Sequence, residues 1–411
     1  MEKFDFPKQF PRDSNNDALY RPSQSLKQII TMMKHSIPKI FTVGVALLMI
    51  LSARAEEAIK IGGLFDLSGK AQQIGAPTKE VAQMMVDRIN KNGGLNGRQI
   101  ELIVADTQSE PSQAVVALKR LLGKDKVVAV IGPTTTGAAM ACMNAIEEAK
   151  IPMVACVGGD APVNPARKWV FKTPQRTSSA VERLYTHLKE TGLKKIGLLT
   201  ASDKFGQEGE AYLKSLATKN GIEIIAQESF DPNDTDMSVQ WIKVASTKPQ
   251  AIVVWTIGPA GALIAKNAAQ NASDIPLFQC HGQPDAAYVK LAGEAANGTA
   301  MPSTKLMVAD QLPANDPQRT VVLDFAREFQ QRKIGSMSTH SGYAWDAVQI
   351  VFQALKKVGT EPAALREAIE KTSGYVGVSG IYTLSPTDHC GLDVGSLVIV
   401  KVENGAWKLV K

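Results

Sequence analysis

Cysteine and histidine are scarce, since four cysteines and five histidines stand among 411 residues. So few cysteines exclude a scaffold built on disulfides. An oxidising compartment would allow one or two bridges among Cys142, Cys156, Cys280 and Cys390, and free thiols are the alternative. No two histidines stand four residues apart, and no cysteine–histidine spacing matches a zinc site. The sequence therefore predicts neither a metal site nor a cofactor.

The motifs of common enzyme classes are also missing. The string nearest to a G-x-S-x-G elbow, Gly377-Val378-Ser379-Gly380, has a different order. No P-loop is present, and no G-x-G-x-x-G turn follows a predicted strand. Catalytic triads are assembled in space rather than in sequence, so these absences do not exclude catalysis. They favour a protein that is not an enzyme.

Long hydrophobic runs are absent apart from residues 40–51, which fall short of the ~20 residues that span a bilayer. Basic residues precede this run, and the small-x-small sequence Ala53-Arg54-Ala55 follows it. This order is typical of a cleaved signal peptide, and a single membrane anchor is the alternative. No cysteine stands at the cleavage point, so we expect a freely diffusing periplasmic protein rather than a lipoprotein.

The predicted mature chain, 56–411, is nearly neutral. Residues 1–31 are polar and without periodicity, which indicates an over-long translation start. Residues 1–55 hold eight of the 46 Lys and Arg and four of the 40 Asp and Glu, which leaves 38 against 36. A net charge of +2 gives no reason to expect nucleic-acid binding.

Short β-branched runs alternate with amphipathic helical stretches through most of the chain. Ala82, Met85, Val86 and Ile89 fall at i, i+3, i+4 and i+7, the spacing of one helix face. The predicted strands are continuous apolar runs, typical of parallel sheets covered by helices on both faces. Strands are predicted at 60–65, 100–105, 127–131, 152–156, 196–200, 222–226, 251–255 and 276–279, and helices at 114–122, 178–190, 236–246, 259–270, 316–332 and 341–357.

This alternation predicts two doubly wound α/β lobes, the second beginning near residue 178. Short strands around 376–384 and 395–410 suggest that the chain crosses between the lobes more than once.

The strand predicted at 127–131 runs into a loop with three consecutive threonines, Thr134 to Thr136. Ligands of doubly wound sheets bind beyond the carboxyl ends of strands, and hydroxyls beside unpaired helix N–H groups form an anion site. No Lys or Arg stands in this loop, so a carboxylate fits better than a phosphate. An ordinary helix N-cap is the alternative. The next strand ends in Gly158-Gly159, which lets a ligand approach the backbone closely.

Several motifs, taken in order, resemble those of the branched-chain amino-acid-binding proteins of ABC importers, the type I periplasmic binding proteins. The resemblance covers 58–411. The motifs are Asp66-Leu67-Ser68-Gly69, the stretch 89–98 closing on Gly97-Arg98, Ile131-Gly132-Pro133, Phe171-Lys172-Thr173, Asp203-Lys204-Phe205-Gly206 and Tyr343-Ala344-Trp345-Asp346-Ala347-Val348.

This resemblance implies a two-lobed clamshell, each lobe a doubly wound, mostly parallel sheet flanked by helices, with crossings near 176, 304 and 383. The lobes would be 56–176 plus 304–383, and 177–303 plus 384–411. A ligand in the cleft would select the closed state. The closed, monomeric protein would then dock on the membrane permease subunits of an ABC importer.

The resemblance also implies a set of ligand-binding positions. Thr136 matches the residue that holds the ligand carboxylate, Phe205 an aromatic of the second lobe and Trp345 an aromatic of the late helix. The complete set is Thr135, Thr136, Gly137, Val157, Gly158, Gly159, Phe205, Trp255, Thr256, His281 and Trp345.

One position departs from the family pattern. Amino-acid binders of this family neutralise the ligand ammonium with a carboxylate, where this chain places His281. Since a buried ammonium without a carboxylate is costly, His281 suggests an aromatic or other non-amino acid. The alternative is that Asp285, Asp160 or Asp203 is the true partner. The family's disulfide in the first lobe is also absent, because Ser109 and Thr135 occupy its positions.

The leading hypothesis is therefore an importer's binding protein for a small carboxylate, either a branched-chain amino acid or an aromatic acid. A ligand-sensing clamshell that reports to a separate receptor or regulator is the second hypothesis. An enzyme on the same scaffold is the third.

Overall fold

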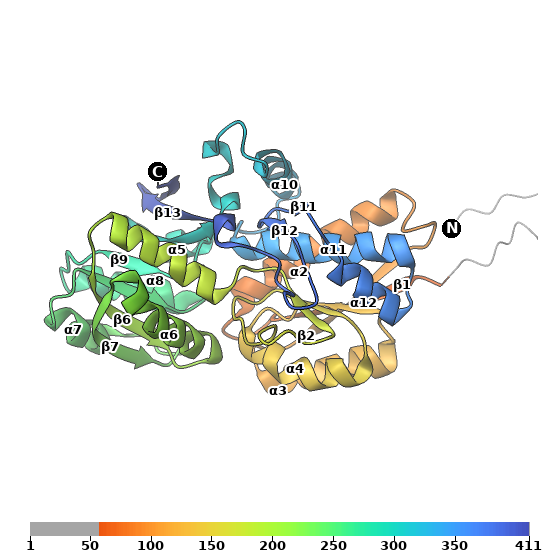
Figure 1. Ribbon diagram of the computed structural model, residues 1–411, viewed down its shortest axis with the longest axis horizontal. Coiled ribbons are helices and arrows are strands. Elements are labelled where there is room, and N and C mark those ends of the chain that lie inside the picture. Colours follow the sequence, from red (N-terminus) through yellow and green to blue (C-terminus); the bar gives the residue numbers. More distant parts are fainter. Residues whose placement is uncertain (1–56, 411) are drawn as a thin grey trace, which may run out of the picture. The chain divides into compact units, whose positions relative to one another are not determined.

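The computed structural model describes residues 57–410, in which two β-sheets are each enclosed by helices (Figure 1). The signal peptide, its cleavage after Ala55 and the over-long start predicted above lie outside the described residues. Between residues 57 and 410, no helix has the length and apolar composition needed to cross a bilayer.

The first sheet has five parallel strands in the order β2-β1-β3-β4-β5. Ile61 and Ile131 pack on one face with α2 and α11, whereas Leu64 and Val130 pack on the other with α3 and α4. The elements are β1 (Ile59–Phe65), α2 (Gln72–Lys91), β2 (Ile100–Asp106), α3 (Pro111–Arg120), β3 (Ala129–Ile131), α4 (Thr136–Ala149), β4 (Met153–Ala155), β5 (Val170–Lys172), α11 (Thr339–Val358) and α12 (Pro362–Glu370).

The second sheet has seven strands in the order β14-β13-β10-β9-β8-β6-β7. Strands β6 to β10 are parallel to their neighbours among themselves, and β13 and β14 add an antiparallel edge. The elements are α5 (Thr177–Glu190), β6 (Lys195–Ala201), α6 (Lys204–Ala217), β7 (Glu223–Phe230), α7 (Ser238–Ser246), β8 (Ala251–Trp255), α8 (Pro259–Gln270), β9 (Leu277–Gln279), α9 (Ala286–Ala292), β10 (Ala300–Thr304), β13 (Leu397–Glu403) and β14 (Ala406–Leu409).

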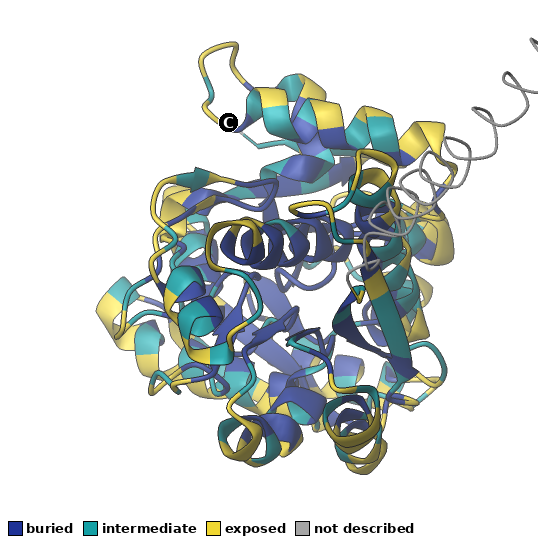
Figure 2. Ribbon diagram, turned by 90° about the vertical axis from the view of Figure 1, so that its right-hand side faces the viewer, coloured by how far each residue is buried: buried dark blue, intermediate teal, exposed yellow. Residues whose placement is uncertain are grey.

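The remaining described elements are helix α10 (Arg319–Gln331) and a hairpin of β11 (Tyr375–Val376) and β12 (Ile381–Tyr382). Figure 2 shows the buried strands surrounded by helices whose outer faces are exposed. The described chain thus contains two β-sheets that are covered by helices, as the continuous apolar strands predicted.

Both sheets share one strand order, in which the second strand flanks the first on one side and the third on the other. The order therefore reverses between β1 and β3 in the first sheet, and between β6 and β8 in the second. Loops leaving the carboxyl ends of such strand pairs diverge to opposite faces of the sheet and open a crevice for ligands. The topology thus indicates that a ligand site would lie among the loops after β1, β3, β6 and β8.

The chain segments between the sheets are joined by hydrogen bonds. The Gln175 amide donates to the Ser379 carbonyl at 2.6 Å, and the Tyr382 hydroxyl donates to the Thr173 carbonyl at 2.7 Å. These contacts bring together two of the predicted crossings, near 176 and 383. The exact lobe boundaries stay predictions.

The predicted two-lobed, doubly wound α/β fold is confirmed, with differences in the short elements. Strands β5 and β10 and helices α9 and α12 were not predicted. Strand β10 contains Pro302 and three polar or small residues, so its sequence lacks the apolar run that marks the other strands. All four cysteines lie among the described residues and are buried free thiols there.

Candidate binding cleft

Asp66 organises the end of the first sheet where β1 and β3 finish. Its buried carboxylate accepts hydrogen bonds from the hydroxyls of Thr107 and Thr134, which belong to the loops after β2 and β3. Burial raises the pKa of Asp66, and the two hydroxyls oppose that shift. Gly132 has a φ of +97°, and a Cβ there would lie 2.0 Å from the Leu64 carbonyl oxygen. This loop is therefore drawn tightly over the end of β1.

The first turn of α4 is left without a side-chain cap. Thr135 occupies the N-cap position but forms no capping hydrogen bond, and Thr134 is engaged by Asp66. The Thr136 hydroxyl accepts from the Gly159 backbone N–H at 3.2 Å. The ordinary N-cap considered as an alternative is thus not formed. The positive end of the α4 dipole and the hydroxyl proton of Thr136 face a place suited to an anion.

A cavity of about 250 Å³ lies at this helix terminus and is lined by both halves of the fold. The first half contributes the loops after β1, β2 and β3, and the second contributes the loops after β6 and β8. The cavity therefore joins the two strand-order reversals. Its lining is Lys70, Ser109, Pro111, Thr135, Thr136, Gly137, Ser202, Asp203, Lys204, Phe205, Gln207 and Ile257.

A second, inner cavity of about 10 Å³ shares Thr136, Phe205 and Ile257 with the outer one. A space of this size admits a single water-sized group. Its further lining is Thr134, Gly158, His281, Gly282, His340 and Tyr343. Every side chain on this list is neutral, provided that the two histidines are uncharged.

Burial keeps both histidines uncharged at neutral pH. It lowers the pKa of His281 from 6.5 to about 3, assisted by the nearby Lys172 ammonium, and lowers that of His340 to about 4. The His340 Nε2 lies 3.1 Å from the Gly282 carbonyl oxygen, which can only accept, so Nε2 carries the proton. Neither ring nitrogen of His281 has a hydrogen-bond partner within the described residues.

Gly158 allows the two halves to meet closely at this point. A Cβ on Gly158 would lie 2.8 Å from Phe205 Cε2 and 3.1 Å from His281 Nε2, which both belong to the second half. Any larger residue would occupy the space between these rings and β4. The close approach predicted at Gly158 was that of a ligand, whereas the neighbours that the structure shows there are side chains of the opposite half.

A buried ion pair between Lys172 and Asp160 stabilises the loop that contains Gly158 and Gly159. The Lys172 ammonium donates to the carbonyls of Gly158, Gly159 and Gln175 at 2.8, 2.9 and 3.1 Å, and lies 3.4 Å from the Asp160 carboxylate. Both charged side chains are at most 2% exposed. Lys172 therefore fixes the glycine loop relative to the crossing near 176.

Glu208 on α6 provides a direct bond between the halves. Its two carboxylate oxygens accept from the backbone N–H groups of Asp160 and Ala161 at 2.6 and 2.9 Å. Asp160 and Ala161 follow β4 of the first sheet, whereas α6 follows β6 of the second. These charge-assisted bonds stabilise the arrangement in which the cleft is narrow.

The structure brings together most of the predicted site residues. Gly159 lies against Thr136, since a Cβ there would be 2.5 Å from the threonine methyl group. The predicted residues that line the cavities are Thr135, Thr136, Gly137, Gly158, Phe205 and His281.

Trp345 is placed elsewhere. Its ring packs edge-on against Phe325 at 5.3 Å and under the Arg88 guanidinium at 5.6 Å, and it lines neither cavity. Consecutive helix residues are rotated by about 100°, so Trp345 points away from Tyr343, which does line the inner cavity. The aromatic of the late helix that lines the cavity is therefore Tyr343, and the predicted residue Trp345 does not line it.

Three further predicted residues lie behind the lining. Trp255 is fully buried and packs against Phe205 and His281 at ring distances of 6.1 and 5.7 Å. Val157 and Thr256 are buried, and neither cavity includes them. Side chains alternate across a strand and its extension, so the neighbours Gly158 and Ile257 face the cleft instead.

Sequence reasoning missed the cationic lining and two polar residues of α11. Lys70 and Lys204 border the outer cavity, so the expected absence of lysine holds for the threonine loop alone. Lys70 follows β1 and reaches the site only through the fold. His340 and Tyr343 are three residues apart on α11, in a fully buried stretch. Polar side chains in such a stretch were the available signal.

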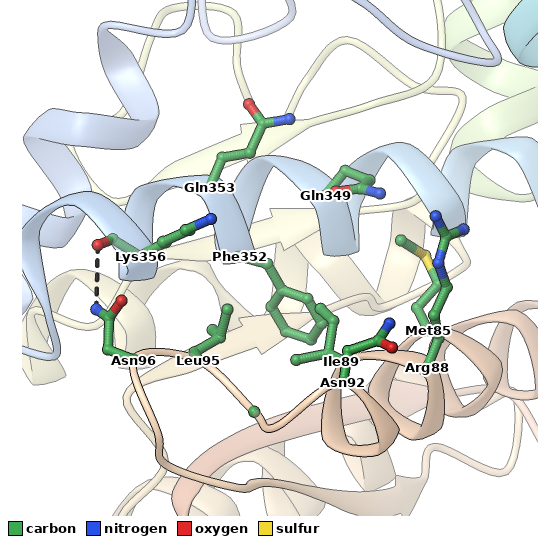
Figure 3. Close-up of a pocket in the computed structure, with 11 residues that line it drawn as sticks. Met85, Arg88, Ile89, Asn92, Leu95, Asn96, Gln349, Phe352, Gln353 and Lys356 are labelled. Carbon is green, nitrogen blue, oxygen red and sulfur yellow. Dashed lines mark hydrogen bonds between the residues drawn. The ribbon is translucent and has the colours of Figure 1, made fainter.

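A separate groove of about 370 Å³ runs between α2 and α11 (Figure 3). Phe352 and Ile89 point into it from facing helices, and Asn96 bonds the Lys356 carbonyl at its end. All of its lining belongs to α2, the loop that follows α2, and α11, so no part of the second sheet contributes. It lacks the convergent loops that define the cleft.

Within residues 57–410, no group of three or more potential metal ligands is assembled. The lining of the cleft offers hydrogen bonding, helix-dipole attraction, the charges of Lys70, Asp203 and Lys204, and aromatic packing.

Comparisons with known proteins agree with the two-lobed fold. A family model described as periplasmic binding protein matches residues 58–406. The Leu/Ile/Val-binding protein BraC3 of Rhizobium johnstonii is 26% identical over 318 residues, covering 74% of this chain and 86% of that protein.

Two solved structures are also similar. An extracellular ligand-binding receptor from Rhodopseudomonas palustris HaA2 has a TM-score of 0.80 and 26% identity, covering 86% of this chain and 100% of that one. The branched-chain amino acid transporter substrate binding protein LivJ of Streptococcus pneumoniae, in complex with isoleucine, has a TM-score of 0.76 and 26% identity, with the same coverage.

Proposed function

The chain belongs to the periplasmic binding protein family, and on that premise we propose that it captures a small carboxylate-bearing solute for an ABC importer. The solute lies between the two lobes, and the closed protein delivers it to the permease subunits in the membrane. The protein acts as a monomer in the periplasm and performs no catalysis.

The observation that carries this proposal is the shared lining of the 250 Å³ cavity. The uncapped α4 terminus with Thr136 supplies the carboxylate site, and Phe205 with Ile257 supplies an apolar wall from the other lobe. A ligand that touches both walls stabilises the closed state by its differential affinity for that state. Delivery to a permease then depends on a surface that exists only when the lobes are closed.

Two ligand classes fit the carboxylate site, a branched-chain amino acid and an aromatic acid. The first is supported by the relatives, one of which is described as binding leucine, isoleucine and valine. The second is supported by the rings of Phe205, Trp255 and His281, which lie within about 6 Å of one another.

Thermal unfolding of the purified protein tests this function. The panel contains leucine, valine, phenylalanine, benzoate and 4-hydroxybenzoate. A ligand at about 100 times its dissociation constant stabilises the folded state by about 2.7 kcal/mol. We expect at least one compound to raise the unfolding temperature, and Thr136→Val to reduce that shift by half or more. No shift with any carboxylate would contradict the proposal.

A further inference from the structure

His281 is a buried polar group whose ring nitrogens make no hydrogen bond of acceptable geometry within residues 57–410. It is 1% exposed, and both of its ring nitrogens are unpaired among the described residues. An unsatisfied buried donor or acceptor costs about 1–3 kcal/mol. His281 lines the inner cavity, next to the place where Thr136 meets the outer one. A ligand group entering the inner cavity would satisfy this ring.

The surroundings of His281 determine which ligand group that can be. His340 offers an unpaired Nδ1, which is an acceptor because Nε2 is protonated toward Gly282. The Tyr343 hydroxyl donates to Gln175 at 3.1 Å and retains its lone pairs. These groups can donate to and accept from a neutral oxygen. None of them carries the negative charge that a buried ammonium requires.

The Asp160 carboxylate is already neutralised by the protein. It pairs with the buried Lys172 ammonium and accepts from the Thr177 and Ser178 backbone N–H groups at 2.8 and 3.3 Å, as well as from the Ser178 hydroxyl. Asp160 is therefore part of the support of the crossing near 176 and has no charge left for a ligand.

The other candidate carboxylates are no better placed. Asp285 caps α9 by accepting from the Ala287 N–H and lines neither cavity. Asp203 borders the outer cavity, where it caps α6 and shares the lining with Lys70 and Lys204. Two ammonium groups against one carboxylate, together with the α4 dipole, make this lining attractive to anions.

We propose that the ligand is a carboxylate without an α-ammonium group, and that it places a neutral hydroxyl or carbonyl oxygen against His281 in the inner cavity. This inference rests on the proposed function and narrows its ligand class. The carboxylate binds at Thr136 and the α4 terminus. The apolar body of the ligand packs on Phe205 and Ile257.

Matched ligand pairs that differ only in the amine test the inference by isothermal titration calorimetry. The pairs are L-leucine with its α-hydroxy analogue, and L-phenylalanine with phenyllactate; benzoate and 4-hydroxybenzoate test the aromatic oxygen. We expect the amine-free member of a pair to bind at least tenfold tighter. An amino acid that binds as tightly as its analogue would overturn the inference and leave the proposed function standing. Failure of every carboxylate to bind would overturn the proposed function itself.

A variant provides an independent second measurement. His281→Asp places a carboxylate at the inner cavity and should move the preference within each pair toward the amino acid by at least tenfold. Thr136→Val should weaken both members equally, because it acts on their shared carboxylate. An unchanged preference in a folded His281→Asp protein would show that His281 does not face the ligand.

Discussion

The pH dependence of stability provides a direct test of the uncharged state of His281. Burial lowers the pKa of this residue in the folded protein from 6.5 to about 3. Because the folded-state pKa is depressed, the stabilisation is present above pH 6.5 and is lost as the pH falls toward 3. Between about pH 7 and about pH 5, protonation of the unfolded chain at this one site should cost about 2 kcal/mol.

Other groups titrate in the same interval, so the comparison must be made with a variant. His340 acts in the same direction as His281, whereas burial raises the pKa of Asp285 and Asp346 to about 6. Each of these aspartates destabilises the folded protein when it is charged. Their contribution to the unfolding free energy is therefore present at low pH and is lost as the pH rises through about 6. His281→Gln removes only the contribution of His281 to this pH dependence.

Urea unfolding without ligand, followed by tryptophan fluorescence, provides the measurement. The unfolding free energy of the unmodified protein should fall by about 2 kcal/mol more than that of His281→Gln between about pH 7 and about pH 5. His187→Gln is the control, since His187 is only half-buried on α5 and should change this difference less. A difference below about 0.5 kcal/mol for His281→Gln would refute the assignment of a buried neutral imidazole.

Three substitutions probe the cleft itself, each measured by titration calorimetry with the carboxylate of the panel that raises the unfolding temperature most. Thr136→Val should weaken binding about 10- to 100-fold, since a hydrogen bond to a charged group contributes about 1.5–3 kcal/mol. Thr136→Ser should retain most of the affinity, and an equal loss in both variants would exclude a role of the hydroxyl in binding. Gly158→Ala should weaken binding at least tenfold by keeping the lobes apart, whereas a Cβ at Gly123 meets nothing within 4 Å and Gly123→Ala should be neutral. Glu208→Gln should weaken binding about fivefold through loss of a charged acceptor between the lobes. Glu210→Gln should not weaken it, because the bonds of Glu210 with Thr200 and Lys214 stay within one lobe. Equal effects of the two variants would argue against a role of Glu208 in closing the lobes.

The sequence alone predicted the α/β architecture, and it identified the threonine loop that lines the cavity of the first lobe, for two physical reasons. Buried parallel strands must be apolar on both faces, so strands such as 251–255 can be recognised in the sequence as continuous apolar runs. The site at Thr136 is local, because strand, loop and helix N-terminus are consecutive in the chain. The glycines at 158 and 159 were recognisable for the same reason.

The opposite wall of the cleft was decided by the tertiary structure. Lys70 and Ile257 lie far apart in sequence, and only the two strand-order reversals bring them to one cavity. The helical phase of α11 directs Tyr343 rather than Trp345 into the site, a rotation that a sequence motif does not resolve. The state of His281 likewise depends on its complete burial among Phe205 and Trp255, since a histidine in water would be free to ionise and to find partners. Local sequence thus determined the threonine loop and the glycines on one side of the cavity, whereas the packing of distant segments determined the side chains that line its other side.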